Sequence, residues 1–140
     1  MKLMGLDIGD RRIGVAFGDS DLRMATPAEV VVRAALEQDA RVLGDFVRGY
    51  EVTKIIIGLP RNIDGTLGAQ AQAVIAYTQA LAPFIDLPME FWDERLSTIE
   101  ATRRTHETGA RGKKSRRNID AIAAAVILQD YLDSQSNEVV

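Results

Sequence analysis

Acidic side chains occupy positions in this sequence where metal-assisted chemistry would need them. Asp7 lies inside the apolar run KLMGLDIG, Asp93 and Glu94 follow the apolar residues of EFW, and Asp120 precedes a helix-like apolar pattern. Burying a carboxylate among apolar neighbours is costly unless a cation or hydrogen-bond donors compensate its charge. The position of Asp7 therefore calls for a compensating partner.

Carboxylates that gather in one place repel each other unless a hard cation bridges them. Mg²⁺ and Mn²⁺ prefer such oxygen ligands. One or two of these ions activate a water molecule and stabilise the leaving oxygen of a phosphodiester. If the acids meet, the sequence predicts a divalent-metal site for phosphodiester hydrolysis.

The elements that position these acids follow from hydrophobic periodicity and turn signals. The predicted strands are residues 2–8, 12–18, 29–33, 52–58 and 87–92, and the predicted helices are about 36–50, 68–84, 97–108 and a last one capped by Asn118. Three leading strands that form a meander, followed by strand–helix alternation, predict an α/β fold with a mixed five-stranded sheet flanked by helices. We expect one domain over residues 1–140, with a frayed polar tail at 133–140.

The acids share one edge of this sheet if its first, fourth and fifth strands run parallel. The carboxyl edge of an open α/β sheet is the usual position for a site. Strand alternation points Asp93 and Glu94 to opposite sides, so at most one of them faces Asp7. Other interpretations remain open: Asp7 as an acceptor of turn hydrogen bonds, Asp93 and Glu94 as solvated loop acids, and Asp120 as a partner of the helix dipole.

Positive charge is concentrated in one segment, although the formal net charge of the chain is −3. Residues 103–117 contain a single acid, Glu107, and seven basic residues: Arg103, Arg104, Arg111, Lys113, Lys114, Arg116 and Arg117. The run RGKKSRR, directly before Asp120, predicts a flexible loop that becomes ordered on nucleic acid, with a solvated face as the alternative. Few aromatic residues lie near it, which favours recognition of the phosphate backbone over base stacking.

Further polar residues lie close to the predicted edge. Arg11 or Arg12, just after the first turn, and Arg95 are candidate contacts for substrate phosphates, and a solvated turn base is the alternative. Asn62 lies in a loop of the pattern Asn-x-Asp-Gly, where turn chemistry explains its presence as well as substrate contact does. The single histidine, His106, is expected at the surface and not as a metal ligand.

Composition limits the class of protein. The chain has no cysteine, which excludes a disulfide framework and a thiolate metal site. No apolar run reaches the roughly 20 residues of a membrane span, and no signal peptide precedes the first strand. We expect a cytoplasmic protein that does not bind membranes.

Four blocks of sequence resemble the signature blocks of the YqgF family, also called RuvX, within the RNase H-like superfamily. They are GLDIGDRRIGVAFGD at 5–19, IIIGLPRNIDGT at 55–66, WDERLST at 92–98 and NIDAIAAAVILQDYL at 118–132. The resemblance implies an RNase H-like fold and metal-dependent phosphodiester cleavage. Carried over by position, the family's catalytic and metal-binding acids fall on Asp7, Glu94 and Asp120.

The resemblance also implies a substrate class. Such proteins are linked to maturation of the 5′ end of 16S ribosomal RNA, and a role as Holliday junction resolvases has been proposed for them. The leading hypothesis is therefore a nuclease acting on precursor ribosomal RNA with Mg²⁺ or Mn²⁺, as a monomer or homodimer. The alternatives are a resolvase of branched DNA, which would need a dimer, and a ribosomal RNA-binding module without catalysis. A nucleotide-binding protein is the last alternative, because DIGDRRIG resembles the phosphate loop of actin- and hexokinase-type ATPases.

Overall fold

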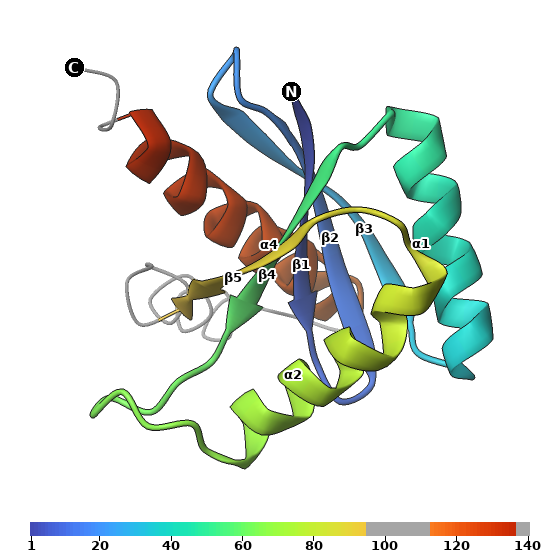
Figure 1. The fold of residues 1–140 in the computed structure, drawn as a ribbon, viewed down its shortest axis with the longest axis vertical. Coiled ribbons are helices and arrows are strands. Elements are labelled where there is room, and N and C mark those ends of the chain that lie inside the picture. The colour runs from blue at the N-terminus through green and yellow to red at the C-terminus, as the bar shows by residue number, and fades with distance from the viewer. Residues whose placement is uncertain (95–112, 137–140) are drawn as a thin grey trace.

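The strands form where the sequence has short apolar runs. The computed structural model describes residues 1–94 and 113–136. The strands are β1 (Lys2–Ile8), β2 (Arg12–Asp19), β3 (Met24–Val32), β4 (Lys54–Leu59) and β5 (Met89–Asp93). They form one sheet in the order β3-β2-β1-β4-β5 (Figure 1).

The sheet is mixed, as predicted. β1 pairs antiparallel with β2, and β2 pairs antiparallel with β3. β1 pairs parallel with β4, and β4 pairs parallel with β5. The carboxyl ends of β1, β4 and β5 therefore share one edge of the sheet, which is the arrangement that the sequence required for the acids to meet.

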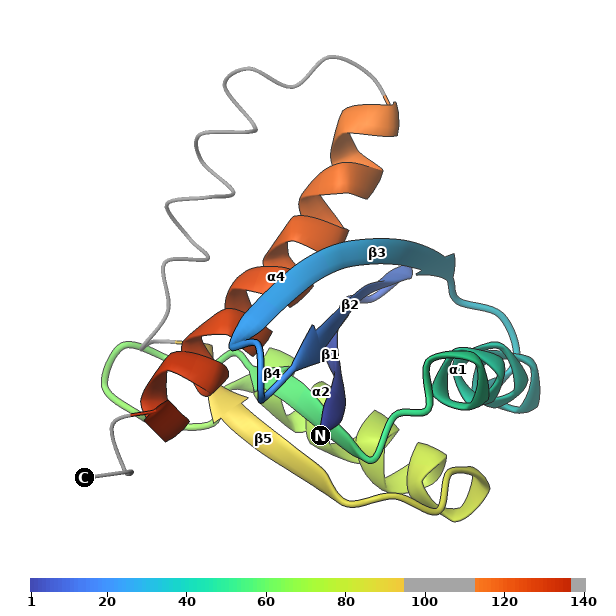
Figure 2. The same cartoon turned by 90° about the horizontal axis from the view of Figure 1, so that it is seen from above.

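Helices cover both faces of this sheet. α1 (Leu36–Tyr50), α2 (Ala69–Leu81) and the 3₁₀ turn η1 (Ala82–Phe84) lie on one face, and α4 (Lys113–Ser136) crosses the other (Figure 2). The core under α1 and α2 is built from large aliphatic side chains, among them Leu6, Leu43, Ile55, Ile57 and Leu81. The core under α4 combines Leu3, Ile56, Ile127 and Leu128 with the helix alanines Ala123, Ala124 and Ala125. Within the described residues, no helix has the length and apolar character needed to cross a membrane.

The beginning of α4 corrects one prediction. The sequence indicated a basic loop and a helix capped by Asn118, but the helix begins at Lys113. Lys and Arg are good helix formers, and adding a turn to a helix already held by packing is cheap, so no loop is required there. The helix also continues to Ser136, so residues 133–136 are helical and not a frayed tail. The predicted helix at 97–108 lies outside the described residues.

β3 is the other element that the sequence placed wrongly, because it begins at Met24 and not at residue 29. It is an edge strand, and most of its side chains are exposed, so it lacks the alternating apolar pattern that marks a half-buried strand. Pro27 lacks an N–H group and is tolerated because edge strands do not need every donor. The pairing of β2 with β3 shifts register at Val15/Ala16, next to this proline.

Candidate active site

Asp7 lies near the carboxyl end of β1, on the face that α4 covers. Its Cα partner in β2 is Gly14. On the β4 side, Leu6 pairs with Ile57, so the next residue along β4, Gly58, lies beside Asp7. The acid is 8% exposed and is flanked across the sheet by two residues without side chains. This row of Gly14, Asp7 and Gly58 is the floor of the candidate site.

The two glycines make room for the other two acids. A Cβ atom at Gly14 would overlap the backbone carbonyl of Asp120, so α4 touches the sheet directly at that point. A Cβ atom at Gly58 would lie 2.6 Å from Oε1 of Glu94. The backbone of one acid and the carboxylate of another therefore occupy the space above the glycines on either side of Asp7.

Glu94 and Asp93 lie on opposite faces of the sheet, as strand alternation predicted. Asp93, the last residue of β5, pairs with Leu59, whose side chain belongs to the core under α1 and α2. One Asp93 oxygen lies 3.9 Å from Nε of Arg61. Glu94 follows β5, and its carboxylate lies over Gly58 on the α4 face. Of these two acids, Glu94 is the one that lies on the same face of the sheet as Asp7.

Asp120, in the part of α4 that crosses β2, forms an ion pair with Arg12 at the start of β2. Nε of Arg12 donates a hydrogen bond of 2.7 Å to Oδ2 of Asp120, and the side chains are 38% and 21% exposed. Arg12 and Gly14 lie two positions apart in a strand and so share a face. The guanidinium therefore lies on the same face of the sheet as Asp7.

The donor set of Asp7, Glu94 and Asp120 has the chemistry of a Mg²⁺ or Mn²⁺ site, because all three supply carboxylate oxygens. In the described ranges 1–94 and 113–136, no three acidic, histidine or cysteine groups already stand close enough together to hold an ion. Asp120 is instead paired with the guanidinium of Arg12. The chemistry of the three carboxylates fits the ion, and binding it would require them to stand closer together than they do here.

The candidate contacts for nucleic acid fall into three groups. Arg11 is exposed on the turn between β1 and β2, beside Arg12. Arg95 and Arg111 lie outside the described residues. The remaining basic candidates, Lys113, Lys114, Arg116 and Arg117, belong to the first turns of α4, which also carries Asp120.

Asn62 is accounted for by its loop. Its amide nitrogen donates a hydrogen bond of 3.0 Å to the hydroxyl of Thr66, and Asp64 accepts hydrogen bonds from the backbone and the hydroxyl of the same threonine. Gly65, at a φ of 89°, supplies the left-handed residue of the turn. These contacts support the turn-chemistry interpretation, and the loop still lies after β4 at the edge that carries Glu94.

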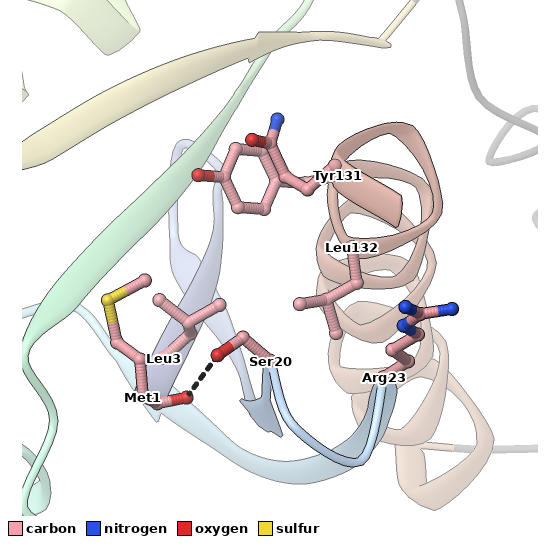
Figure 3. Close-up of a pocket in the computed structure, with 7 residues that line it drawn as sticks. Met1, Leu3, Ser20, Arg23, Tyr131 and Leu132 are labelled. Atoms are coloured by element: carbon pink, nitrogen blue, oxygen red, sulfur yellow. Dashed lines mark hydrogen bonds between the residues drawn. The ribbon is translucent and has the colours of Figure 1, made fainter. Parts of the chain in front are cut away.

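A cavity of about 230 Å³ lies at the opposite end of β1 (Figure 3). Its lining residues are Met1, Leu3, Ser20, Arg23, Tyr131, Leu132 and Gln135. None of the three candidate acids lines it. The candidate active site is therefore the row of Gly14, Asp7 and Gly58 under α4, and not this cavity.

Sequence reasoning missed two features of this site. One is the pair of glycines beside Asp7, and the other is the bond between Arg12 and Asp120. Glycine inside a strand signals the close approach of another backbone or a ligand. Gly14 and Gly58, in RIGVAFG and IIIGLP, carried that signal; the ion pair had no counterpart in local sequence.

Comparison of the chain with known proteins gives consistent relatives. Residues 1–134 match the model of a family described as RuvX, Holliday junction resolvase. A Halothermothrix orenii protein named "Putative pre-16S rRNA nuclease" is 44% identical over 136 residues, which cover 97% of this chain and 97% of that protein. A Desulforamulus reducens protein of the same name is 42% identical over 134 residues, or 96% of this chain and 98% of that protein.

A solved structure shares the fold at low sequence identity. It is Thermus thermophilus RuvC in complex with a Holliday junction substrate, with a TM-score of 0.60 and 12% identity. The match covers 98% of this chain and 96% of that one. The fold is RNase H-like, as the sequence resemblance implied.

Proposed function

Because the chain belongs to the RuvX family, we propose that it is a nuclease that hydrolyses phosphodiester bonds of precursor 16S ribosomal RNA. The observation that carries the proposal is the arrangement of Asp7, Glu94 and Asp120 around two glycines on the α4 face. The relatives named for this activity, which match nearly the whole chain, support the same assignment. The protein would act in the cytoplasm, where ribosomal RNA is processed.

Asp7, Glu94 and Asp120 are the proposed ligands of one or two Mg²⁺ or Mn²⁺ ions. Such an ion supplies Lewis-acid chemistry, since it activates water and neutralises charge on the reacting phosphate. Asp7 is suited to anchor it because a cation compensates a carboxylate that is only 8% exposed. The α4 packing fixes the backbone of Asp120 against β2, so the helix and the strand are held in register at the proposed reacting centre.

Eight basic residues and Asn62 are the proposed contacts for the rest of the substrate. Phosphate contacts from Arg and Lys position a nucleic acid without reading its sequence. The proposed set is Arg11, Arg12, Asn62, Arg95, Arg111, Lys113, Lys114, Arg116 and Arg117. Four of these lie on the first turns of α4, so the helix that carries Asp120 would also bind the flanking phosphates.

Resolution of branched DNA is the second candidate function. It is favoured by the description of the matching family and, at the level of fold, by the similarity to a junction-bound resolvase. Junction resolution needs two cuts related by symmetry, so it requires a homodimer with two sites. A protein that stays monomeric and cuts RNA but not four-way junctions would exclude this function.

The test compares adjacent acids on opposite faces. Wild type, Asp7→Asn, Glu94→Gln and Asp93→Asn are incubated with precursor ribosomal RNA and with a four-way DNA junction, each with Mg²⁺ and Mn²⁺. We expect Asp7→Asn and Glu94→Gln to lose about a thousandfold in cleavage rate, since a catalytic metal contributes several kcal/mol. Binding, measured by fluorescence anisotropy, should remain.

Asp93→Asn is the matched control, because it removes a neighbouring charge from the other face of the sheet. It should cleave at close to the wild-type rate. Full activity of Asp7→Asn, or equal losses in Asp93→Asn and Glu94→Gln, would contradict the assignment. Tight binding of RNA by wild type without cleavage in Mn²⁺ would show a binding module in place of a nuclease.

A further inference from the structure

The bond between Arg12 and Asp120 joins residues 108 positions apart in the chain. It links Arg12, the first residue of β2, to α4. Its length of 2.7 Å is that of a strong, charge-assisted hydrogen bond. Arginine keeps its proton at any ordinary pH, so the positive charge beside Asp120 is removed only when the Arg12 side chain moves away.

We propose that Arg12 holds Asp120 in the place of a divalent ion, and moves to a substrate phosphate when the ion and the nucleic acid bind. The inference rests on the proposed function, since it concerns the same acids. It assigns Arg12 as a positioning residue that makes binding of the ion and binding of the nucleic acid cooperative.

The coupling between ion binding and nucleic-acid binding follows from two requirements. An ion that binds Asp120 competes with a guanidinium that already neutralises the carboxylate through Oδ2, so ion binding alone is weakened. A displaced Arg12, 38% exposed and on the α4 face, then needs another anion. A phosphate group matches the planar fork of donors on arginine and accepts two parallel hydrogen bonds from it. The nucleic acid therefore removes the competitor of the ion, and the ion frees the arginine for the nucleic acid.

The backbone around the pair is held in place, so the exchange needs movement of side chains alone. Arg12 lies in a strand between β1 and β3, and its carbonyl accepts a hydrogen bond of 2.8 Å from the amide of Gly9. The backbone of Asp120 rests directly on Gly14. Both side chains are partly exposed, which leaves solvent-accessible space at the pair.

The experiment measures Mn²⁺ binding by calorimetry for wild type, Arg12→Gln and Arg41→Gln. Arg41→Gln is the charge-matched control, because Arg41 is exposed on α1, on the other face of the sheet, and its replacement keeps the ion pair. Without nucleic acid, we expect Arg12→Gln to bind Mn²⁺ about tenfold more tightly than wild type, within the usual range of coupling between sites. Arg41→Gln should stay within about twofold of wild type.

The second arm repeats the titration with Ca²⁺, which takes the same oxygen ligands, in the presence of a short double-stranded RNA. A gel run afterwards confirms that the RNA is intact. The RNA should tighten Ca²⁺ binding about tenfold in wild type and in Arg41→Gln, and by linkage Ca²⁺ should tighten RNA binding equally. In Arg12→Gln both effects should disappear.

Folding of the variant is followed separately by thermal unfolding in EDTA. Arg12→Gln should unfold at a lower temperature than wild type in EDTA, and recover a larger share of its stability when Mn²⁺ is added. Equal Mn²⁺ affinity in wild type and Arg12→Gln, or equal coupling of ion and RNA binding in the two proteins, would overturn the proposed role of Arg12. Neither result would contradict the proposed metal site. Failure of folded wild type and both variants to bind either ion would instead overturn the proposed metal site, and this inference with it.

Discussion

The two faces of the sheet solve the packing of a helix in different ways. On the face under α1 and α2, branched and aliphatic side chains such as Leu43, Ile55 and Ile57 fill the space between helix and sheet. On the other face, glycines of β1, β2 and β4 let α4 come into direct contact with the strands. Close approach gives up side-chain volume, and in return it places the backbone of Asp120 directly against Gly14, the β2 partner of Asp7.

Each face also holds a carboxylate with defined hydrogen-bond partners, and the partners differ. Asp39, 2% exposed, accepts hydrogen bonds from the backbone of Ala34 at 2.9 Å and from the hydroxyl of Tyr77 at 2.8 Å. Those donors are neutral parts of the fold. Asp120 is paired with the charged side chain of Arg12, and both side chains are partly exposed. The comparison separates a buried acid bonded to neutral donors from a partly exposed acid bonded to a cation.

The largest effect on stability is expected where the helix touches the sheet, at Gly14. In Gly14→Ala the new methyl group would overlap the backbone of Asp120, and a backbone cannot rotate away as a side chain does. We expect the free energy of unfolding to fall by about 3 kcal/mol, the upper end of the range for overpacking. Urea denaturation measures it.

Gly49→Ala is the control for Gly14→Ala. Gly49 lies in α1, where a Cβ atom would meet nothing within 4 Å. Alanine is the better helix former, so this variant should gain up to about 1 kcal/mol. If the two variants changed stability alike, direct contact between α4 and β2 would not be what distinguishes the faces.

Gly58→Ala sharpens the comparison, because its neighbours are the ends of side chains. The methyl group would lie 2.6 Å from Oε1 of Glu94 and would overlap the end of Ile127. Both side chains can rotate, so we expect a loss of only about 1 kcal/mol in the free energy of unfolding. The cleavage rate should fall roughly a hundredfold, since small displacements of a reacting group are costly.

Gly18→Ala is the matched variant for Gly58→Ala. A Cβ atom at Gly18 would lie 2.8 Å from Cδ2 of Leu128 in α4 and 3.0 Å from the backbone oxygen of Met24. Gly18 pairs with Leu3 at the amino end of β1, whereas Glu94 follows the carboxyl end of β5. A comparable loss of stability with an unchanged cleavage rate is the expected result. A loss of activity in Gly18→Ala as large as in Gly58→Ala would mean that α4 packing in general, and not the position of Glu94, controls the rate.

Local sequence was sufficient for the elements whose apolar pattern is strong. β1 and α1 begin and end where the sequence predicted, at Lys2–Ile8 and Leu36–Tyr50, because a continuous buried run marks β1 and a periodic apolar face marks α1. The pattern failed where burial is weak: on the exposed edge strand β3, and on the charged first turns of α4. Neither segment needs apolar periodicity to join an element that packing elsewhere already holds.

The site could be predicted only in part for a related reason. Asp7 was identified because a lone acid in an apolar strand requires a partner, which is a local signal. The position of Glu94 over Gly58 depends on the pairing of β4 with β5, and the bond from Arg12 to Asp120 depends on where α4 crosses β2. Such relations arise from tertiary register, which the residues flanking each acid do not encode.

The smallest effect is expected on the face under α1 and α2, in Tyr77→Phe. The variant removes the hydroxyl that donates to Asp39, and one lost hydrogen bond lowers the free energy of unfolding by about 1 kcal/mol at pH 7. Burial, followed by the bond to Asp39, raises the pKa of Tyr77 above its ordinary value of 10.0. The neutral phenol is thus favoured in the folded state, so its contribution is complete below pH 10 and is lost as the pH rises beyond it.

Urea denaturation of wild type and Tyr77→Phe between pH 7 and 11 tests this sign. The stability gap between them should narrow above about pH 10, as the unfolded tyrosine ionises. Lys54, whose pKa is raised chiefly by its hydrogen bond to Tyr131, also titrates in this range, but it does so in both proteins and cancels in the difference. A gap that stays constant with pH would mean that Asp39 and Tyr77 are not a coupled pair. Asp39 would then be held by the backbone N–H of Ala34 alone. The contrast between Asp39 and Asp120 would depend on the bond from Arg12 to Asp120 and not on Tyr77.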